Sequence, residues 1–155
     1  MKNLFLLLLS FVAFTGYTQT SLKPVTWSAT YVSNSATEGE IQFTATIEKK
    51  WHIYSQRPTD VGPIPTSFTI SANSDIELIG KVVEENAHEE YVPAFDAKVF
   101  VFSEKAVFKQ KIKLKNQKGT TVKATLEFMS CNDVKCLPPD LIDFSVIVPS
   151  SLQKK

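Results

Sequence analysis

The stretch "TTVKATLEFMS", residues 120–130, alternates apolar and polar side chains. Val122, Ala124, Leu126 and Phe128 fall on one side of the alternation, and polar residues fall on the other. Successive side chains of a β-strand point to opposite faces, so a period of two is typical of a strand with one buried and one solvated face. The stretch therefore predicts a strand whose apolar face meets the core.

The same alternation recurs on both sides of this stretch. It covers residues 39–51, 106–115 and 141–149, with the apolar positions Ile41, Phe43, Ala45, Ile47, Ala106, Phe108, Ile112, Leu114, Ile142, Phe144, Val146 and Val148. Shorter strands are predicted at 25–33, 66–72, 76–84 and 97–103, and no stretch has the period of an amphipathic helix. Seven to nine strands, spaced roughly ten residues apart, predict an all-β fold, an antiparallel β-sandwich.

Lysines occupy the polar side of residues 106–115. Lys109, Lys111, Lys113 and Lys115 alternate with the apolar positions. We interpret them as the solvent face of an exposed strand, where lysine also discourages edge-to-edge aggregation, and not as a site for an anionic ligand.

The first residues are typical of an export signal. Lys2 precedes an apolar run from Leu4 to Phe14, which is shorter than the roughly 20 residues that span a bilayer. We place a signal peptide at residues 1–19, with cleavage between Gly16 and Thr20. Residues 20–155 then form one domain, which we expect to be soluble and exported to the periplasm, with secretion beyond it as an alternative.

Net charge and length limit the function. Removal of Lys2 with the leader lowers the 17 basic residues to 16, equal to the 16 acidic ones. A neutral chain argues against a nucleic-acid partner, which calls for a basic patch. A domain of this size buries a sufficient core without disulfides, although export places its two cysteines where a disulfide can form.

Both cysteines lie in "EFMSCNDVKCLPP", residues 127–139. Asn132 and Asp133 favour a turn that brings Cys131 and Cys136 together, and Lys135 is a positive charge that favours the reactive thiolate. As a structural crosslink, a disulfide that closes so short a loop stabilises a fold by only about 2 kcal/mol. From spacing alone, an inert hairpin disulfide and a redox pair both remain open.

A metal site is disfavoured. Zinc requires four ligands, and the only histidines, His52 and His88, lie in separate segments without ligand-like spacing. We expect His52 to be a strand residue packed beside Trp51 and Tyr54.

The cysteine segment resembles the cysteine motif of the periplasmic N-terminal domain of the DsbD thiol:disulfide interchange proteins, in which Cys, a short loop and Cys precede Pro-Pro. The segment Trp51–Tyr54 is similar to that domain's aromatic-rich early strand, and the resemblance runs from Trp27 to Val148. The loop between the cysteines is one residue shorter here than in the best-known members. The transmembrane and thioredoxin-like domains that normally follow are missing from this sequence, which leaves the direction of electron transfer open.

The resemblance implies an immunoglobulin-like sandwich and a reductant role. It implies that Cys131 and Cys136 are the redox pair, with Cys136 the nucleophile and Cys131 the resolving cysteine. It also implies an aromatic cap over the disulfide, for which Phe95 is the first candidate and Tyr91 the second. Lys135 would tune the thiol pKa.

The implied partners are thioredoxin-fold periplasmic proteins, of the disulfide isomerase or cytochrome c maturation type, and a separate membrane electron donor. The exchange needs no metal and no other cofactor. The alternative function is an exported immunoglobulin-like binding or adaptor module with a purely structural disulfide, because sandwiches host many unrelated functions.

Overall fold

The computed structural model describes residues 22–59, 62–71 and 73–150. The predicted signal peptide lies outside these residues. Within them the chain forms eleven strands: β1 (Val25–Ser33), β2 (Glu38–Ile47), β3 (His52–Tyr54), β4 (Ser67–Ser71), β5 (Ile76–Glu84), β6 (His88–Val92), β7 (Ala97–Ser103), β8 (Lys105–Leu114), β9 (Thr120–Phe128), β10 (Ser130–Cys131) and β11 (Asp140–Val148). One short 3₁₀-helix, η1 (Pro93–Phe95), separates β6 from β7. No helix in the described ranges has the length and apolar character needed to span a membrane.

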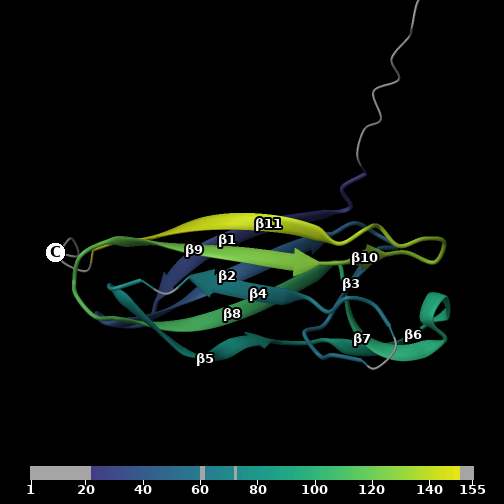
Figure 1. Ribbon diagram of the computed structural model, residues 1–155, viewed down its shortest axis with the longest axis horizontal. Helices are drawn as coiled ribbons and strands as arrows, with labels where there is room; N and C mark the ends of the chain where they lie inside the picture. Colours follow the sequence, from purple (N-terminus) through teal and green to yellow (C-terminus); the bar gives the residue numbers. More distant parts are fainter. Residues whose placement is uncertain (1–21, 60–61, 72, 151–155) are drawn as a thin grey trace, which may run out of the picture.

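The strands form three antiparallel sheets. One has the order β1-β2-β8-β5, the second β11-β9-β4, and the third β10-β3-β7-β6. The first two lie along most of the molecule's length, and the third lies at one end (Figure 1). The predicted antiparallel sandwich with an immunoglobulin-like architecture is confirmed. The expected number of seven to nine strands was too low, because β3, β6 and β10 show no apolar–polar alternation with a period of two.

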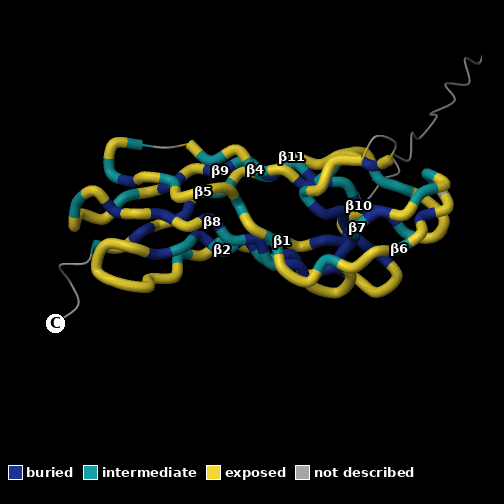
Figure 2. The backbone as a smooth tube through the Cα atoms, turned by 90° about the horizontal axis from the view of Figure 1, so that it is seen from below, coloured by how far each residue is buried: buried dark blue, intermediate teal, exposed yellow. Residues whose placement is uncertain are grey.

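The main core lies between the two long sheets. Phe43 and Phe108 come from the first sheet, and both are fully buried. The ring of Phe43 packs 5.3 Å from Phe144 of β11, and Phe108 packs 5.8 Å from Trp27 of β1. The buried segments follow the length of the molecule between its strand layers (Figure 2). Burial of an aromatic side chain contributes about 2–3 kcal/mol, so the alternating apolar faces hold these sheets together.

Sheet-switching corners connect the sandwich to the end sheet. Glu104, with φ of 63°, separates β7 from β8 and lies between two different sheets. Met129 likewise separates β9 from β10. A residue in the left-handed region turns the strand direction sharply, which lets one run of sequence serve two sheets. The chain continues from β9 past Met129 into β10, which places Cys131 in the end sheet.

The lysine row lies on β8, which has β2 and β5 on its two sides. Lys111, Lys113 and Lys115 are exposed, as expected for a solvent face. The expectation that these lysines protect a sheet edge was wrong, because β8 is an interior strand. Gln110 is the polar exception on the inner face, and its amide donates hydrogen bonds to the carbonyls of Ile79 (3.1 Å) and Lys111 (2.8 Å).

Candidate redox site

A tight hairpin brings the two cysteines together. The Asn132 N–H donates to the carbonyl of Lys135 at 2.9 Å. The side-chain Oδ1 of Asn132 accepts hydrogen bonds from the N–H groups of Val134 and Lys135, both at 2.9 Å. Asparagine favours such turns because its short amide bonds to the backbone two or three residues ahead. One side chain therefore organises the loop between the cysteines.

Cys131 and Cys136 occupy an antiparallel pair between two backbone hydrogen-bonded positions. The Asn132–Lys135 bond closes one side, and the Leu137 N–H donates to the Ser130 carbonyl at 2.9 Å on the other. Directly opposite residues of such a non-hydrogen-bonded pair approach most closely, with Cα atoms about 4.5 Å apart. The Cα atoms of Cys131 and Cys136 are 4.0 Å apart, and the two side chains form a disulfide.

The two sulfur-bearing residues differ in exposure. Cys131 is fully buried in a cluster that also contains Tyr54, Val99 and Val101, whereas Cys136 is half-buried at the side of the same cluster. An attacking thiol must reach a sulfur along the S–S axis, so access decides which sulfur reacts. Cys136 is therefore the more accessible residue of the pair, and Cys131 is kept away from solvent.

Phe95 packs against the cluster that holds the disulfide. Its ring lies edge-on to Tyr54, with the ring centroids 6.1 Å apart. Phe95 is the last residue of η1, which begins at Pro93. Asp96 follows it with φ of 49°, and its N–H donates a hydrogen bond to the Pro93 carbonyl at 3.2 Å. This compact turn holds the aromatic side chain over the disulfide end of the sheet.

Tyr91 lies differently from Phe95. Its side chain is on the exposed side of β6, 52% exposed, and its hydroxyl donates a hydrogen bond to the Asp96 carboxylate. This bond raises the pKa of the Tyr91 hydroxyl. Tyr91 thus joins the strand before η1 to the residue that ends it, while Phe95 makes the contact with the cluster.

Comparison with known proteins identifies the family from the sequence and supports the fold from solved structures. The model of the family "Thiol:disulfide interchange protein DsbD, N-terminal" matches residues 19–146. The chain belongs to the DsbD N-terminal family. Its fold is also that of two solved domains. The reduced N-terminal domain of DsbD from Neisseria meningitidis is 15% identical, with a TM-score of 0.51, over 74% of this chain and 87% of that one.

The second solved domain is the N-terminal periplasmic domain of ScsB from Proteus mirabilis. It is 15% identical, with a TM-score of 0.51, over 81% of this chain and 47% of that one. At this identity the two structures support the fold alone, and the family rests on the sequence match. No curated protein matches the chain.

His52 is a site residue of this DsbD N-terminal domain that the sequence did not reveal as one. It lies directly opposite Cys131 in the pairing of β10 with β3, so its side chain is on the same face of the sheet. It is buried, its Nε2 is 3.0 Å from the Tyr54 hydroxyl, and the two rings meet edge-on. The expected strand position beside Tyr54 is confirmed, but the pairing with Cys131 depends on tertiary structure.

Burial controls the protonation of this pair. Desolvation lowers the pKa of His52 and raises the pKa of Tyr54, because each charged form loses water. The negative charge of Glu90 raises the pKa of both residues, and that of Asp133 on the hairpin raises the pKa of His52. A polar cavity of ≈ 210 Å³ is lined by His52, Glu90 and Asp133, among other residues, so the imidazole adjoins space that water can fill.

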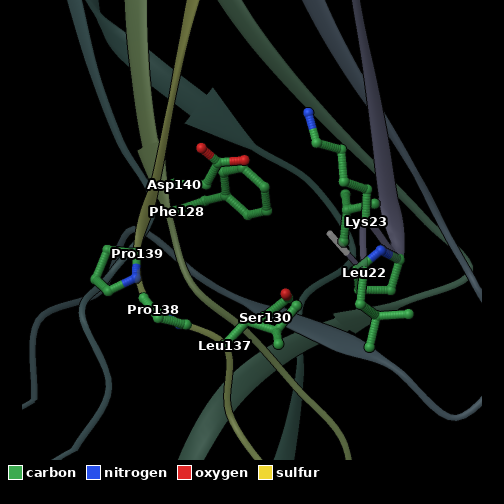
Figure 3. A pocket seen from close by; sticks show the side chains of 10 residues that line it. Leu22, Lys23, Phe128, Ser130, Leu137, Pro138, Pro139 and Asp140 are labelled. Carbon is green, nitrogen blue, oxygen red and sulfur yellow. The ribbon is translucent and has the colours of Figure 1, made fainter. Parts of the chain in front are cut away.

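A larger cavity lies behind the hairpin in this family member. It has a volume of ≈ 440 Å³, and its lining includes Phe128, Ser130 and Leu137. Lys23 and Asp140 lie on opposite walls of the cavity (Figure 3). Ser130 and Leu137 alternate with the cysteines along their strands, so this cavity is on the opposite side of the hairpin from Phe95 and Tyr54.

The remaining predicted residue, Lys135, is exposed on the hairpin, where only its backbone makes the turn bonds described above. Its effect on the thiol pKa stays a prediction. Among the residues that the structure describes, no group of three or more His, Cys, Asp or Glu side chains could hold a metal ion.

Proposed function

We propose that this domain is a periplasmic thiol–disulfide exchange module, in which Cys131 and Cys136 relay two electrons to thioredoxin-fold proteins. One observation carries the proposal: a chain of the DsbD N-terminal family joins a buried cysteine to a half-exposed one in a preformed turn. Its electron donor would be a separate membrane protein, and its acceptors would be disulfide isomerase or cytochrome c maturation partners. Export through the signal peptide belongs to the same proposal.

The first half of the reaction reduces the module. A donor thiolate attacks Sγ of Cys136, the bond to Cys131 breaks, and Cys131 leaves as a thiolate that then takes up a proton. The second donor thiolate attacks the donor sulfur of the mixed disulfide and releases Cys136. The donor becomes a disulfide, the module becomes a dithiol, and two electrons have moved.

The second half passes the electrons on. The Cys136 thiolate attacks the acceptor disulfide and forms a mixed disulfide. Cys131 then attacks Sγ of Cys136, which restores the internal disulfide and releases the acceptor as a dithiol. The roles follow from access: the partner reaches Cys136, while buried Cys131 has only Cys136 within reach.

Phe95 would limit unwanted exchange. Its side chain packs on the cluster that contains both cysteines, on the side where their sulfurs lie. A small thiol would have to pass it to reach the disulfide, whereas a protein partner could displace it through other contacts. We therefore assign the shielding role to Phe95.

A trapping experiment tests the cysteine roles. Cys131→Ser leaves Cys136 without its resolving thiol, so it should accumulate mixed disulfides with thioredoxin-fold proteins in a periplasmic extract. Cys136→Ser is the matched control and should accumulate few, because its remaining cysteine is buried. Equal capture by both variants would contradict the assignment of Cys136.

The reduction potential separates this function from an inert structural disulfide. A structural bridge lies below about −300 mV, and a relay bridge lies well above that value. Equilibration of the folded domain with glutathione mixtures of known ratio measures the potential. A value at or below the structural limit would support the binding-module alternative.

A further inference from the structure

The tip of the cysteine hairpin presents an apolar side chain to solvent. Val134 is 89% exposed, more than any other exposed large hydrophobic residue in the described part of the chain. It lies between Cys131 and Cys136, two residues before the half-exposed cysteine. Single exposed apolar residues are common on proteins, so exposure alone assigns no role.

The position of Val134 is built into the turn. Its own N–H and the next one donate to Oδ1 of Asn132, and the Asn132–Lys135 backbone bond closes the loop beneath it. These bonds hold the backbone on both sides of the side chain. Val134 is therefore held outward by the same contacts that bring the two sulfurs together.

The chemistry of exchange determines what covers this tip. A partner that bonds to Cys136 must bring its own sulfur to about 2 Å from the Cys136 sulfur. Two residues of extended chain span at most about 7 Å. Even a small redox encounter buries about 600 Å² on each partner, a patch roughly 14 Å in radius. Val134 thus lies within the footprint of a protein that forms this mixed disulfide.

The surroundings favour an apolar contact over a charged one. Asp133 and Lys135 flank Val134 with opposite charges, so the tip presents no net charge for steering. Pro138, Pro139 and Leu141 after the hairpin are also exposed, Leu141 by 66%, with the charged Asp140 between the prolines and Leu141. The hairpin tip therefore offers a partner one apolar side chain in a fixed position.

We propose that Val134 is a docking contact for the thioredoxin-fold redox partner, which covers it with an apolar surface beside its reactive cysteine. This inference rests on the proposed function and adds the contact that distinguishes a protein partner from a small thiol. A small dithiol needs only Cys136 and makes no use of the tip.

The test compares two reductants on the full mature domain. Reduced thioredoxin is the protein probe and dithiothreitol is the small probe, with the rate of reduction of the Cys131–Cys136 disulfide as the readout. Val134→Asp places a charge in the contact, and Val134→Ala removes only part of the side chain. Ile147→Asp is the matched control, because Ile147 is 74% exposed on β11 and pairs with Thr121 at the start of β9, whereas the cysteine hairpin follows the end of β9.

We expect Val134→Asp to slow reduction by thioredoxin about tenfold and Val134→Ala about threefold, the loss from part of one apolar contact. Dithiothreitol rates should stay within twofold, and Ile147→Asp should match the wild type with both probes. An unchanged thioredoxin rate in Val134→Asp, or an equal loss with both probes, overturns the docking role. A wild-type disulfide that dithiothreitol reduces and thioredoxin does not also overturns it, whereas resistance to both probes overturns the proposed function itself.

Discussion

Cys131 and His52 lie directly opposite each other in the pairing of β10 with β3. His52 is buried, and its ring shares a hydrogen bond with Tyr54, whose own ring packs against Phe95. The cysteine hairpin, His52 and the η1 turn thus form one connected group of side chains. Substitution of each of these residues in turn tests what it contributes to stability or to the reactivity of the disulfide.

The first prediction concerns pH. Burial lowers the pKa of His52, whereas Glu90 and Asp133 act to raise it and His88 to lower it. The folded state therefore binds fewer protons than the unfolded chain once pH falls to about 6.5, the ordinary histidine value. The contribution of neutral His52 to the unfolding free energy is fully present above pH 6.5. It is lost as the pH falls from 6.5 through the lowered pKa of folded His52.

Urea unfolding at several pH values between 8 and 5 measures this effect. The wild-type unfolding free energy should fall more on acidification than that of His52→Gln, which keeps a polar side chain and does not titrate. His88→Gln is the control for an exposed histidine, with a side chain 52% exposed. A wild-type and a His52→Gln profile that run parallel would contradict the prediction.

The second prediction concerns the cap. Phe95→Ala should raise the rate at which glutathione reduces the disulfide by about tenfold, because the variant leaves a path to Cys136 open more of the time. Phe100→Ala removes an aromatic ring from β7 that packs under Arg57, with the Arg57 Cζ 3.9 Å from its centroid. That control should react at the wild-type rate. Equal rates for wild type and Phe95→Ala would remove the shielding role.

The third prediction concerns the bond between Tyr91 and Asp96. Tyr91→Phe removes only the hydroxyl, and Asp96→Gly removes the acceptor while it keeps a residue that tolerates positive φ. Each should loosen the cap turn and raise the glutathione rate a few-fold, less than Phe95→Ala does. The double variant should react no faster than either single one, because both changes break one bond. Additive increases would show that the two residues act independently of this bond.

The fourth prediction concerns Asn132. Asn132→Ala removes the acceptor of two turn bonds and should destabilise the oxidised domain by about 1 kcal/mol. The reduced hairpin should lose less, because its sulfurs are no longer joined. The disulfide should therefore become easier to reduce, and its re-formation from the dithiol should require more glutathione disulfide. The reduction potential should therefore rise.

A matched asparagine makes that experiment specific. Asn73 organises a different turn, in which its Oδ1 accepts the Asp75 N–H at 2.9 Å. Asn73→Ala should lower the unfolding free energy without a change in the potential of the Cys131–Cys136 pair. A similar potential for both variants and the wild type would show that the turn does not set the redox balance.

Much of the fold could be predicted from alternation alone. The inward positions of β2, β8, β9 and β11 were assigned from a period of two, because a strand with one wet face must alternate. Gln110 was missed as an inward residue, because a polar side chain breaks the apolar alternation. Its buried amide is tolerated since it donates hydrogen bonds to the carbonyls of Ile79 and Lys111, a pairing that the pattern does not show. β6 and β10 were missed, because the residues of β6 do not alternate between apolar and polar types and β10 has only two residues. β3 was expected only as the strand position of His52, since its three residues are all buried and show no alternation.

The local sequence by itself determined the cysteine turn, because the bonds that make it join residues close together in the chain, from Asn132 to Lys135. Only the tertiary structure decided which cysteine is buried, which aromatic side chain packs on its cluster, and that His52 faces Cys131. Those properties depend on β3, η1 and β10, which are distant in sequence and meet only when the strands switch sheets. Contacts between residues that are distant in sequence produce no regular spacing of residue types, so a sequence pattern cannot predict them.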